Sequence, residues 1–531
     1  MERNAAAPFA KPATVSVNPI TRKVLGTSPL HSAQDVADMV QKARRAQKEW
    51  AALPLKKRVL YFYNVEHYLA KNADRLAAII AESTGKTRTD AISTEVLPSV
   101  MAVRYYCKKA PKFLKDRKPL MGAPFLINKR ATIRRAPYGV VGIITPWNYP
   151  FWLPFPEVLT GLIAGNAVIV KTASNTQMVG LALKEAFESA ELPDGLFNYV
   201  NLPGREAGAA FLNAGVDKLF FTGSTAVGKT LMKMAAKTLT PLSLELGGND
   251  PMIVCADANL ERAAAGAVWT AFSNAGQSCG AIERVYVQRE IYQPFLDLVK
   301  QKTEALRIGY DQDFNVDVGG MATEQQMKTV RRQLKDALKR GARVWSQSPL
   351  PDNPEWHNLL PATVLVDVNH DMLVMKEETF GPLMGVMPFD TIEEALRLAN
   401  DTNYGLSASV WSRDYKKADQ IARRIQAGAV LINDHLMSHV MPEAPWGGFK
   451  ESGFGRTHGR EAFEEMTQPQ AIVHDWLGDQ YTNLWYYPYS RKVYQAMRGA
   501  VYAQSGENFW QRLSGLWAVA RMLPKMFHPK L

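Results

Sequence analysis

The sequence predicts an α/β protein in which helices cover the faces of parallel sheets. Short β-rich runs alternate with turns and helical stretches from about residue 140 to residue 432, the pattern of parallel strands joined by crossover helices. Hydrophobic residues make up 47% of the 531 positions, so sizeable cores are available. The length favours about three domains.

Helical patterning comes first along the chain. Apolar or alanine positions recur three and four residues apart in 36–53, 60–80 and 96–114, which predicts helices there. In the segment FLINKRATIRR at 125–135, apolar and polar residues alternate instead. It is expected to form a strand that ends at the PYG turn, 137–139.

Strand–turn–helix units begin after that turn. Each expected strand is short and rich in apolar residues, and polar or glycine-containing turns lead into the helices. A second series of α/β units is predicted from about 251 to 432. In the first series the strands are expected at 140–145, 167–171, 197–200 and 218–222, with a helix at 179–190.

Positive charge is concentrated near the C-terminus. The formal net charge is +12, and 481–531 alone has seven Arg or Lys residues against one acid, Glu507. Apolar residues at helical spacing predict a helix over 509–527, which Pro524 is expected to kink or end. Two interpretations stay open: docking on a partner subunit and contact with an anionic membrane. The apolar residues are Phe509, Leu513, Leu516, Ala520, Leu523 and Phe527, interleaved with Arg512, Arg521 and Lys525.

Cysteine usage and apolar run length indicate the compartment. Cys107, Cys255 and Cys279 do not form a disulfide framework, and no C-x-x-C pair suggests a metal. The start of the chain lacks the apolar core of a signal segment, and no apolar run is long enough to span a bilayer. We therefore expect a cytoplasmic protein with no metal and no nucleic-acid partner.

Cys279 is the first candidate for chemistry. It follows Gly276-Gln277-Ser278, and a thiolate is a strong nucleophile toward a carbonyl carbon. A single cysteine is more often an inert core residue. Its small and polar neighbours nevertheless favour a thiol that stays accessible.

Two further polar residues stand in notable settings. Glu245 lies between two leucines, where a partly desolvated carboxylate would have a raised pKa suited to a general base. The plainer interpretation is a surface glutamate at a strand end. Asn148 lies in the loop PWNYP, where its amide could stabilise an oxyanion or simply form a turn.

Eight motifs follow one another along the chain: PWNYP at 146–150, GNAVIVK at 165–171, FTGSTAVGK at 221–229, LELGGNDP at 244–251, GQSC at 276–279, EETFGP at 377–382, NDTNYGL at 400–406 and PWGGFKESGFGR at 445–456. Taken together and in order, they resemble the aldehyde dehydrogenase superfamily from about residue 15 to residue 473. The step of 34 positions from Glu245 to Cys279 matches as well.

The resemblance implies a Rossmann-like cofactor domain, an α/β catalytic domain and a small β bridging or oligomerisation element. It implies NAD(P)-binding residues 15–244, interrupted by a bridging segment at 119–137, and a catalytic domain at 245–432. Residues 433–474 would return to the cofactor domain and bridging strands. Residues 475–531 form an aromatic, basic extension, which looks similar to a branch including long-chain, apocarotenoid and some succinic semialdehyde enzymes.

The resemblance also assigns roles in oxidising an aldehyde to a carboxylic acid, in a homodimer or homotetramer. Cys279 would be the nucleophile, Asn148 part of the oxyanion hole, and Glu245 the base that activates the deacylating water. A pyrophosphate site at Gly223 agrees with anion binding at helix N-termini. The implied NAD or NADP set is Trp147, Lys171, Ser174, Gly204, Gly223, Ser224, Val227, Glu378 and Phe380, with Lys171 on the adenosine ribose and Glu378 and Phe380 at the nicotinamide side.

Two positions bear on specificity. Ser174 stands where the family often has a glutamate that binds the ribose 2′-hydroxyl, so the missing charge favours acceptance of NADP; weaker NAD binding is the alternative. Pro156 replaces a common bulky aromatic and would widen the substrate tunnel. The matching tunnel positions, Tyr149, Trp152, Leu153, Pro156, Val440 and Trp446, include no arginine and indicate an apolar, aromatic or long-chain aldehyde.

Three alternatives are kept: a succinic semialdehyde dehydrogenase, a CoA-acylating enzyme, and a non-catalytic binding protein on the same fold. The presence of Glu245 argues against the second, because CoA-acylating members tend to lack that glutamate. The presence of Cys279, Asn148 and Glu245 together argues against the third. The sequence does not identify the physiological aldehyde, the preferred cofactor or the oligomer size.

Overall fold

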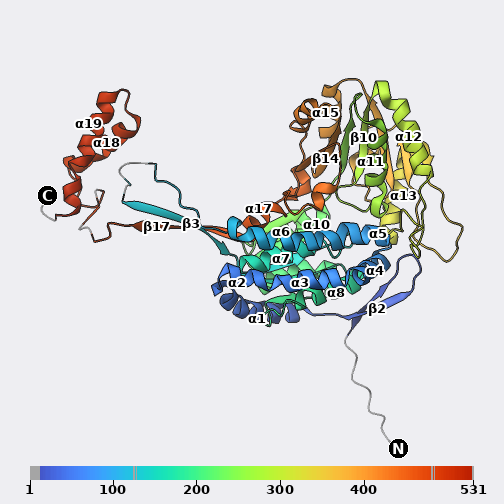
Figure 1. Cartoon of the computed structure of the whole chain (residues 1–531), viewed down its shortest axis with the longest axis horizontal. Helices are drawn as coiled ribbons and strands as arrows, with labels where there is room; N and C mark the ends of the chain where they lie inside the picture. The colour runs from blue at the N-terminus through green and yellow to red at the C-terminus, as the bar shows by residue number, and fades with distance from the viewer. Residues whose placement is uncertain (1–11, 123–125, 127, 480–481, 484, 529–531) are drawn as a thin grey trace, which may run out of the picture. The chain divides into compact units, whose positions relative to one another are not determined.

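A computed structural model describes residues 12–122, 126, 128–479, 482–483 and 485–528. It divides into two compact units (Figure 1). The first unit comprises Met1–Phe113 and Pro137–Thr467, and the second comprises Leu114–Ala136 and Gln468–Leu531. The chain start, where the sequence predicts no signal segment, lies outside the described residues, as do Phe125 and Ile127 of the expected strand 125–135.

The first unit opens with an antiparallel strand pair and a series of helices. The helix expected at 36–53 is present and begins with a capping box, in which Ser32 and Asp35 exchange hydrogen bonds. The periodic stretch 60–80 is divided among helices, with Asn72 in a non-helical conformation between two of them. The bounds are β1 (Ala13–Val17), β2 (Val24–Pro29), α1 (Ala33–Ala52), α2 (Leu55–Leu60), α3 (Phe62–Lys71), α4 (Ala73–Thr84), α5 (Arg88–Ala91), the π-helical turn η1 (Ile92–Val96) and α6 (Leu97–Phe113).

A six-stranded sheet follows, in the order β16-β8-β7-β4-β5-β6. Its strands pair in parallel except for β16, which pairs antiparallel with β8. Every residue of β4, β5 and β7 is buried, as expected for strands covered on both faces. The strands are β4 (Val140–Ile144), β5 (Ala167–Lys171), β6 (Phe197–Tyr199), β7 (Lys218–Thr222), β8 (Leu242–Glu245) and β16 (Gly453–Phe454). The helices are α7 (Pro154–Ala164), α8 (Gln177–Glu188), α9 (Gly204–Ala214), α10 (Thr225–Ala235) and α17 (Gly459–Glu465).

A seven-stranded sheet forms the other core of this unit, in the order β11-β12-β13-β10-β9-β14-β15. All its pairings are parallel except that of the edge strand β11, and helices such as α11 and α12 lie against it (Figure 1). The α/β prediction is therefore confirmed. The strands are β9 (Asp250–Val254), β10 (Ile282–Gln288), β11 (Arg343–Gln347), β12 (Thr363–Val366), β13 (Leu383–Phe389), β14 (Ser407–Trp411) and β15 (Ala429–Ile432). The helices are α11 (Leu260–Phe272), α12 (Tyr292–Glu304), α13 (Glu324–Lys339), α14 (Leu373–Lys376), α15 (Ile392–Asn400) and α16 (Tyr415–Ala422).

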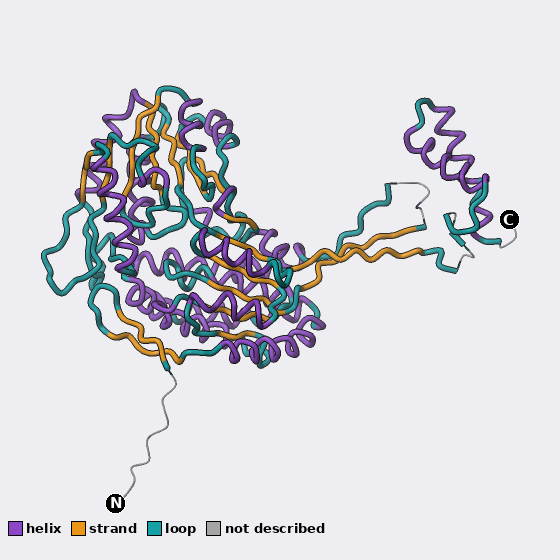
Figure 2. Tube along the Cα trace, turned by 180° about the vertical axis from the view of Figure 1, so that it is seen from behind, coloured by secondary structure: helices purple, strands orange, loops and turns teal. Residues whose placement is uncertain are grey.

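The second unit combines a strand pair with a helical hairpin. β3 (Lys129–Pro137) and β17 (Thr467–Asp475) run side by side (Figure 2). α18 (Arg491–Ser505) and α19 (Phe509–Ala520) pack on each other. The helix predicted over 509–527 is shorter than expected, because it ends at Ala520 and Pro524 lies in a separate 3-10 turn, Leu523–Met526. No helix in the described ranges has the length and apolar content needed to cross a bilayer.

Candidate active site

A thiol and a carboxylate meet between the two sheets of the first unit. Glu245 is the last residue of β8, and the Cys279 sulfur lies 3.9 Å from its Oε1. Thr222 Oγ1, at the end of β7, donates to Glu245 Oε2 at 3.2 Å, and the indole N–H of Trp446 donates to Oε1. The parallel register of β7 and β8 pairs Thr222 with Glu245 directly, so the sheet itself orients the carboxylate.

The Cys279 thiol is less accessible than its small neighbours predict. Cys279 is only 8% exposed, because Leu406 and Trp446 pack around it and Phe380 packs against these three residues. The expectation of an open thiol was therefore wrong. Glycine and serine beside a cysteine permit close backbone packing as well as access.

The loop that carries Cys279 is sharply bent. Asn274, Ala275 and Gly276 all have left-handed backbone angles, with φ of 52°, 54° and 71°. A Cβ at Gly276 would lie 2.3 Å from the Gly381 carbonyl oxygen, so no larger residue fits there. Asp90 supports the bend by accepting a hydrogen bond from the Ser273 hydroxyl at 3.1 Å. This backbone sets the direction of the thiol.

The double glycine of LELGG allows two other close approaches. A Cβ at Gly248 would lie 2.3 Å from the Cys279 carbonyl oxygen, and a Cβ at Gly247 would lie 2.6 Å from Glu378 Oε2. The Gly248 N–H donates to Glu378 Oε1 at 3.0 Å. The motif therefore joins the Cys279 loop to the segment that carries Glu378.

Asn148 belongs to the same cluster. Its backbone oxygen accepts hydrogen bonds from Lys86 Nζ at 2.8 Å and from Asn274 Nδ2 at 3.1 Å, which ties the PWNYP loop to the Cys279 loop. Its own side chain is buried, and the amide oxygen has no protein partner. The loop is thus held through its backbone, which leaves the amide group available for another ligand.

Burial controls the charges here. It raises the pKa of Cys279 well above its usual value, and the negative charges of Glu245, Glu378 and Asp250 raise it further. Burial also raises the pKa of Glu245, although the hydrogen bond from Trp446 opposes this. The pKa of Glu378 rises to about 7 for the same reason. The resting thiol is therefore protonated at neutral pH.

The residues expected to hold a dinucleotide lie at strand ends and at a helix start. Lys171 ends β5 and is buried, which lowers its pKa to about 8. A Cβ at Gly204 would lie 3.7 Å from Lys171 Nζ, so an open backbone faces the ammonium group. Ser224 precedes α10 without capping it through its side chain, so the first backbone N–H groups remain available to an anion.

The remaining members of that set are placed as follows. The rings of Trp147 and Phe380 are 5.5 Å apart, edge to face, while Val227 is exposed on α10 and Ser174 is half-buried in the turn after β5. The accessible backbone at Gly204, the Lys171 ammonium group and the backbone N–H groups at the start of α10 suit a pyrophosphate and its riboses. The residues present therefore fit a dinucleotide.

Three of the six predicted tunnel residues gather around a residue that sequence reasoning missed. His439 lies 5.7 Å from Tyr149, 6.4 Å from Trp152 and 4.9 Å from Trp446, measured between ring centroids. Both imidazole nitrogens are buried, without a hydrogen-bond partner in the described part of the chain, and burial lowers the pKa of His439 to about 4. A lone histidine in a loop carries no sequence signal that distinguishes it.

The other tunnel positions lie at the margin of this group. Pro156 borders a small internal space shared with His458, whose ring is 5.4 Å from Trp152. Leu153 is buried before α7, and Val440, next to His439, is half-buried. The surroundings of the predicted tunnel residues are therefore less apolar than the sequence indicates, because the buried imidazoles of His439 and His458 lie among the aromatic rings.

This arrangement, with a buried thiol, a carboxylate and a strand edge that fits a dinucleotide, is that of an α/β oxidoreductase. Comparison with known proteins gives the family. The aldehyde dehydrogenase family model matches residues 9–472, and the chain belongs to that family.

Individual relatives and solved structures support the same family assignment. A 4,4′-diapolycopene aldehyde oxidase from Methylomonas is 40% identical over 91% of this chain and 90% of its own. A Mycolicibacterium smegmatis protein, provisionally assigned as an NADP(+)-dependent succinate-semialdehyde dehydrogenase, is 38% identical over 85% of this chain and 87% of its own. An aldehyde dehydrogenase from Bacillus cereus, solved with NAD+, has a TM-score of 0.82 at 31% identity, over 87% of this chain and 93% of its own.

Proposed function

We propose that this aldehyde dehydrogenase forms a thioester on Cys279 and hydrolyses it with a water activated by Glu245. The observation that carries the proposal is the 3.9 Å approach of the buried sulfur to the Glu245 carboxylate. A thiol beside a desolvated carboxylate provides a nucleophile and a base at one carbonyl position.

In the first step the Cys279 thiol loses its proton to a water molecule, and the thiolate adds to the aldehyde carbon, so that the carbonyl oxygen becomes an oxyanion. The Asn148 amide and the Cys279 backbone N–H are the proposed donors to it. One such buried donor typically contributes about 3 kcal/mol to the transition state. The backbone bonds from Lys86 and Asn274 to Asn148 support this role, because they fix the loop before substrate arrives.

NAD or NADP, when bound, would supply the hydride acceptor, and loss of hydride from the tetrahedral carbon would leave a thioester on Cys279. Glu245 then takes a proton from a water molecule, and the resulting hydroxide attacks the thioester carbon. The C–S bond breaks, the sulfur leaves as a thiolate and the carboxylic acid departs. The raised pKa of Glu245 supports this role, because a more basic carboxylate removes a proton more readily.

We propose that residues 15–244 form the domain that binds the cofactor. Residues 245–432 would form the catalytic domain that carries the nucleophile, and residues 433–474 would return to the cofactor domain and the bridging strands. Lys171 and Ser174 would face the adenosine ribose, and Gly223 and Ser224 the pyrophosphate. The serine at 174 brings no negative charge toward a 2′-phosphate, which favours acceptance of NADP. An NADP(+)-dependent assignment among the relatives agrees with this preference.

For the substrate we propose an apolar, aromatic or long-chain aldehyde. Tyr149, Trp152 and Trp446 supply three large rings at the site, and one relative is named for a diapolycopene aldehyde. Succinic semialdehyde remains the second candidate, favoured by the name of another relative. The enzyme would act as a cytoplasmic homodimer or homotetramer, with peripheral membrane contact through 475–531.

The test is steady turnover on aldehydes of graded chain length, with NAD or NADP and with or without CoA. We expect turnover without CoA. Cys279→Ala should fall below about a hundredth of wild type while cofactor binding persists, because the thiol is the covalent nucleophile. Cys107→Ala, another buried cysteine, is the matched control. An active Cys279→Ala variant, or a strict requirement for CoA, would overturn the proposal.

A further inference from the structure

The α18–α19 hairpin packs small residues inside and large apolar residues outside. The buried residues of α18 are Val493, Ala496, Gly499 and Ala500, and α19 buries only Gly515. A Cβ at Gly515 would lie 2.4 Å from the Gly499 carbonyl oxygen, so the two backbones touch. Helices that face water normally bury their largest apolar side chains, whereas small-residue contacts are typical of helix pairs in lipid.

The large apolar side chains of α19 are exposed. Trp510 is 74% exposed and Trp517 is 56% exposed, and Phe509, Leu513 and Leu516 are exposed as well. A shallow groove lined by Trp510, Leu513, Leu516 and Trp517 runs along this helix, and its surface is almost wholly apolar. A patch of this kind marks an interaction site.

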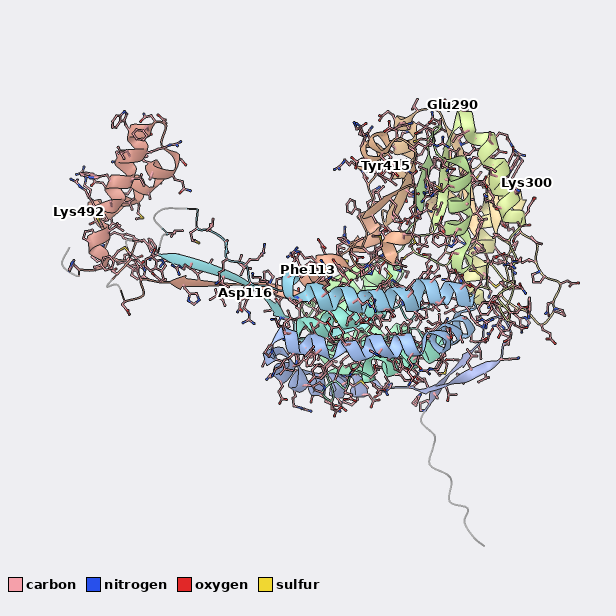
Figure 3. The ribbon with its side chains drawn as sticks, viewed as in Figure 1. Phe113, Asp116, Glu290, Lys300, Tyr415 and Lys492 are labelled. Atoms are coloured by element: carbon pink, nitrogen blue, oxygen red, sulfur yellow. The ribbon has the colours of Figure 1, made fainter. Side chains whose placement is uncertain are left out.

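A second groove crosses the hairpin at the glycine contact. It is bordered by Lys492, Arg498 and Arg521, with Gly499 and Gly515 also in its lining, and none of the described carboxylates lines it. Lys492 is exposed on α18 (Figure 3). The Arg521 guanidinium lies over the Trp517 ring, 3.1 Å from the centroid. Trp517 lines both grooves, so the cationic and apolar surfaces adjoin.

We propose that this hairpin docks on an anionic phospholipid bilayer, with phosphate headgroups at Lys492, Arg498 and Arg521 and acyl chains against the groove of Trp510 and Leu513. The inference deepens the proposed membrane contact of 475–531 and rests on it. Charge complementarity selects the occupant: from Arg491 to His528 the hairpin has six basic residues and one acid, Glu507. A protein partner would cover the apolar groove without needing this excess.

The test is co-sedimentation of the full-length enzyme with vesicles of phosphatidylcholine, alone or mixed with phosphatidylglycerol. We expect binding only to the mixed vesicles, and weaker binding at high salt. The combined change Lys492→Gln, Arg498→Gln and Arg521→Gln should weaken partitioning about a hundred-fold, since each basic residue near an anionic surface contributes a factor of about five. The matched control is Lys328→Gln, Arg331→Gln and Lys335→Gln, three exposed basic residues of α13, which should bind like wild type.

A second variant, Trp510→Ser with Leu513→Ser, should also reduce binding, because it removes apolar area without changing charge. Far-UV circular dichroism and turnover on a water-soluble aldehyde, both expected to be unchanged, report folding and the proposed oxidation separately from lipid binding. Equal sedimentation of wild type and both hairpin variants would overturn the inference. So would variants that keep vesicle binding but lose oligomeric mass, because the hairpin would then be a subunit contact.

Discussion

The Cys279 sulfur lies 3.9 Å from the carboxylate of Glu245, and burial, followed by the charge of Glu245, raises the pKa of the thiol. The indole of Trp446 donates to the same carboxylate oxygen. One acidic group therefore affects both halves of the proposed reaction: its charge disfavours the resting thiolate, and its basicity serves the hydrolysis of the thioester. Removing the charge without changing the shape separates the two effects.

Glu245→Gln should keep acylation and lose deacylation. We expect a burst of reduced cofactor followed by a slow steady state, because the amide cannot take a proton from water. The burst should also extend to lower pH than in wild type, since loss of the negative charge lowers the pKa of Cys279. Rapid-mixing absorbance over a pH series measures both. An equal loss of burst and steady rate would mean that Glu245 is needed before the thioester forms.

Ser174→Glu should shift the cofactor preference toward NAD. A glutamate at about 4 Å from a 2′-phosphate repels it by roughly 1 kcal/mol in water and roughly 4 kcal/mol at an effective dielectric of about 20. We expect the ratio of kcat/KM with NADP to that with NAD to fall about tenfold or more. Ser174→Gln, similar in size but neutral, is the control. If both variants change the ratio equally, side-chain size rather than charge is responsible.

His439 predicts a pH dependence of stability. Burial lowers its pKa from 6.5 to about 4 in the folded chain, so between these values the unfolded state binds more protons. Stability must therefore rise with pH through this window and fall as the pH drops below 6.5. At about pH 4 the contribution lost is about 3 kcal/mol.

His439→Phe should remove that contribution, because phenylalanine keeps the aromatic contacts and cannot be protonated. Urea midpoints at about pH 7 and about pH 4.5 should differ less in the variant than in wild type. His67→Phe, on the exposed surface of α3, is the control and should keep the wild-type slope. An unchanged slope in His439→Phe would show that this imidazole is not held neutral by burial.

Much of the fold follows from local pattern. The strands at 140–144, 167–171 and 218–222 consist mostly of adjacent apolar residues, so burial on both faces is visible in the sequence. The end of α19 was misplaced, because nothing local distinguishes a helix that stops at Ala520 from one that continues to a proline. Helix ends depend on tertiary contacts that a pattern does not carry.

The site was predicted less evenly. Cys279, Glu245 and Asn148 were assigned roles because the motifs around them resemble those of the aldehyde dehydrogenase superfamily. His439 and Lys86 were missed, because their contacts in the site are with residues distant in sequence. Lys86 binds the Asn148 backbone across 62 positions. His439 contacts Tyr149 and Trp152, which lie far earlier in the chain.

Lys86 carries the last prediction. Its ammonium group is fully buried, pairs with Glu95 Oε1 at 2.6 Å and donates to the Asn148 backbone oxygen. Glu95 Oε2 in turn accepts from the Phe151 N–H at 2.8 Å and the Trp152 N–H at 3.2 Å. This buried pair therefore holds the loop at Asn148 itself and just beyond its C-terminal end. Removing one partner of such a pair leaves an uncompensated charge in the core.

Lys86→Met should therefore destabilise the protein by about 3–5 kcal/mol and lower kcat more than it raises KM, because the Asn148 loop loses its backbone anchor while the aromatic substrate contacts remain. Adding Glu95→Gln should recover part of the stability, since it removes the unpaired charge and keeps an acceptor for the two N–H groups. Arg289→Met breaks the exposed pair with Asp390 and should leave the melting temperature nearly unchanged. Thermal melts and steady-state kinetics on the four proteins test the idea, which fails if Lys86→Met melts like Arg289→Met.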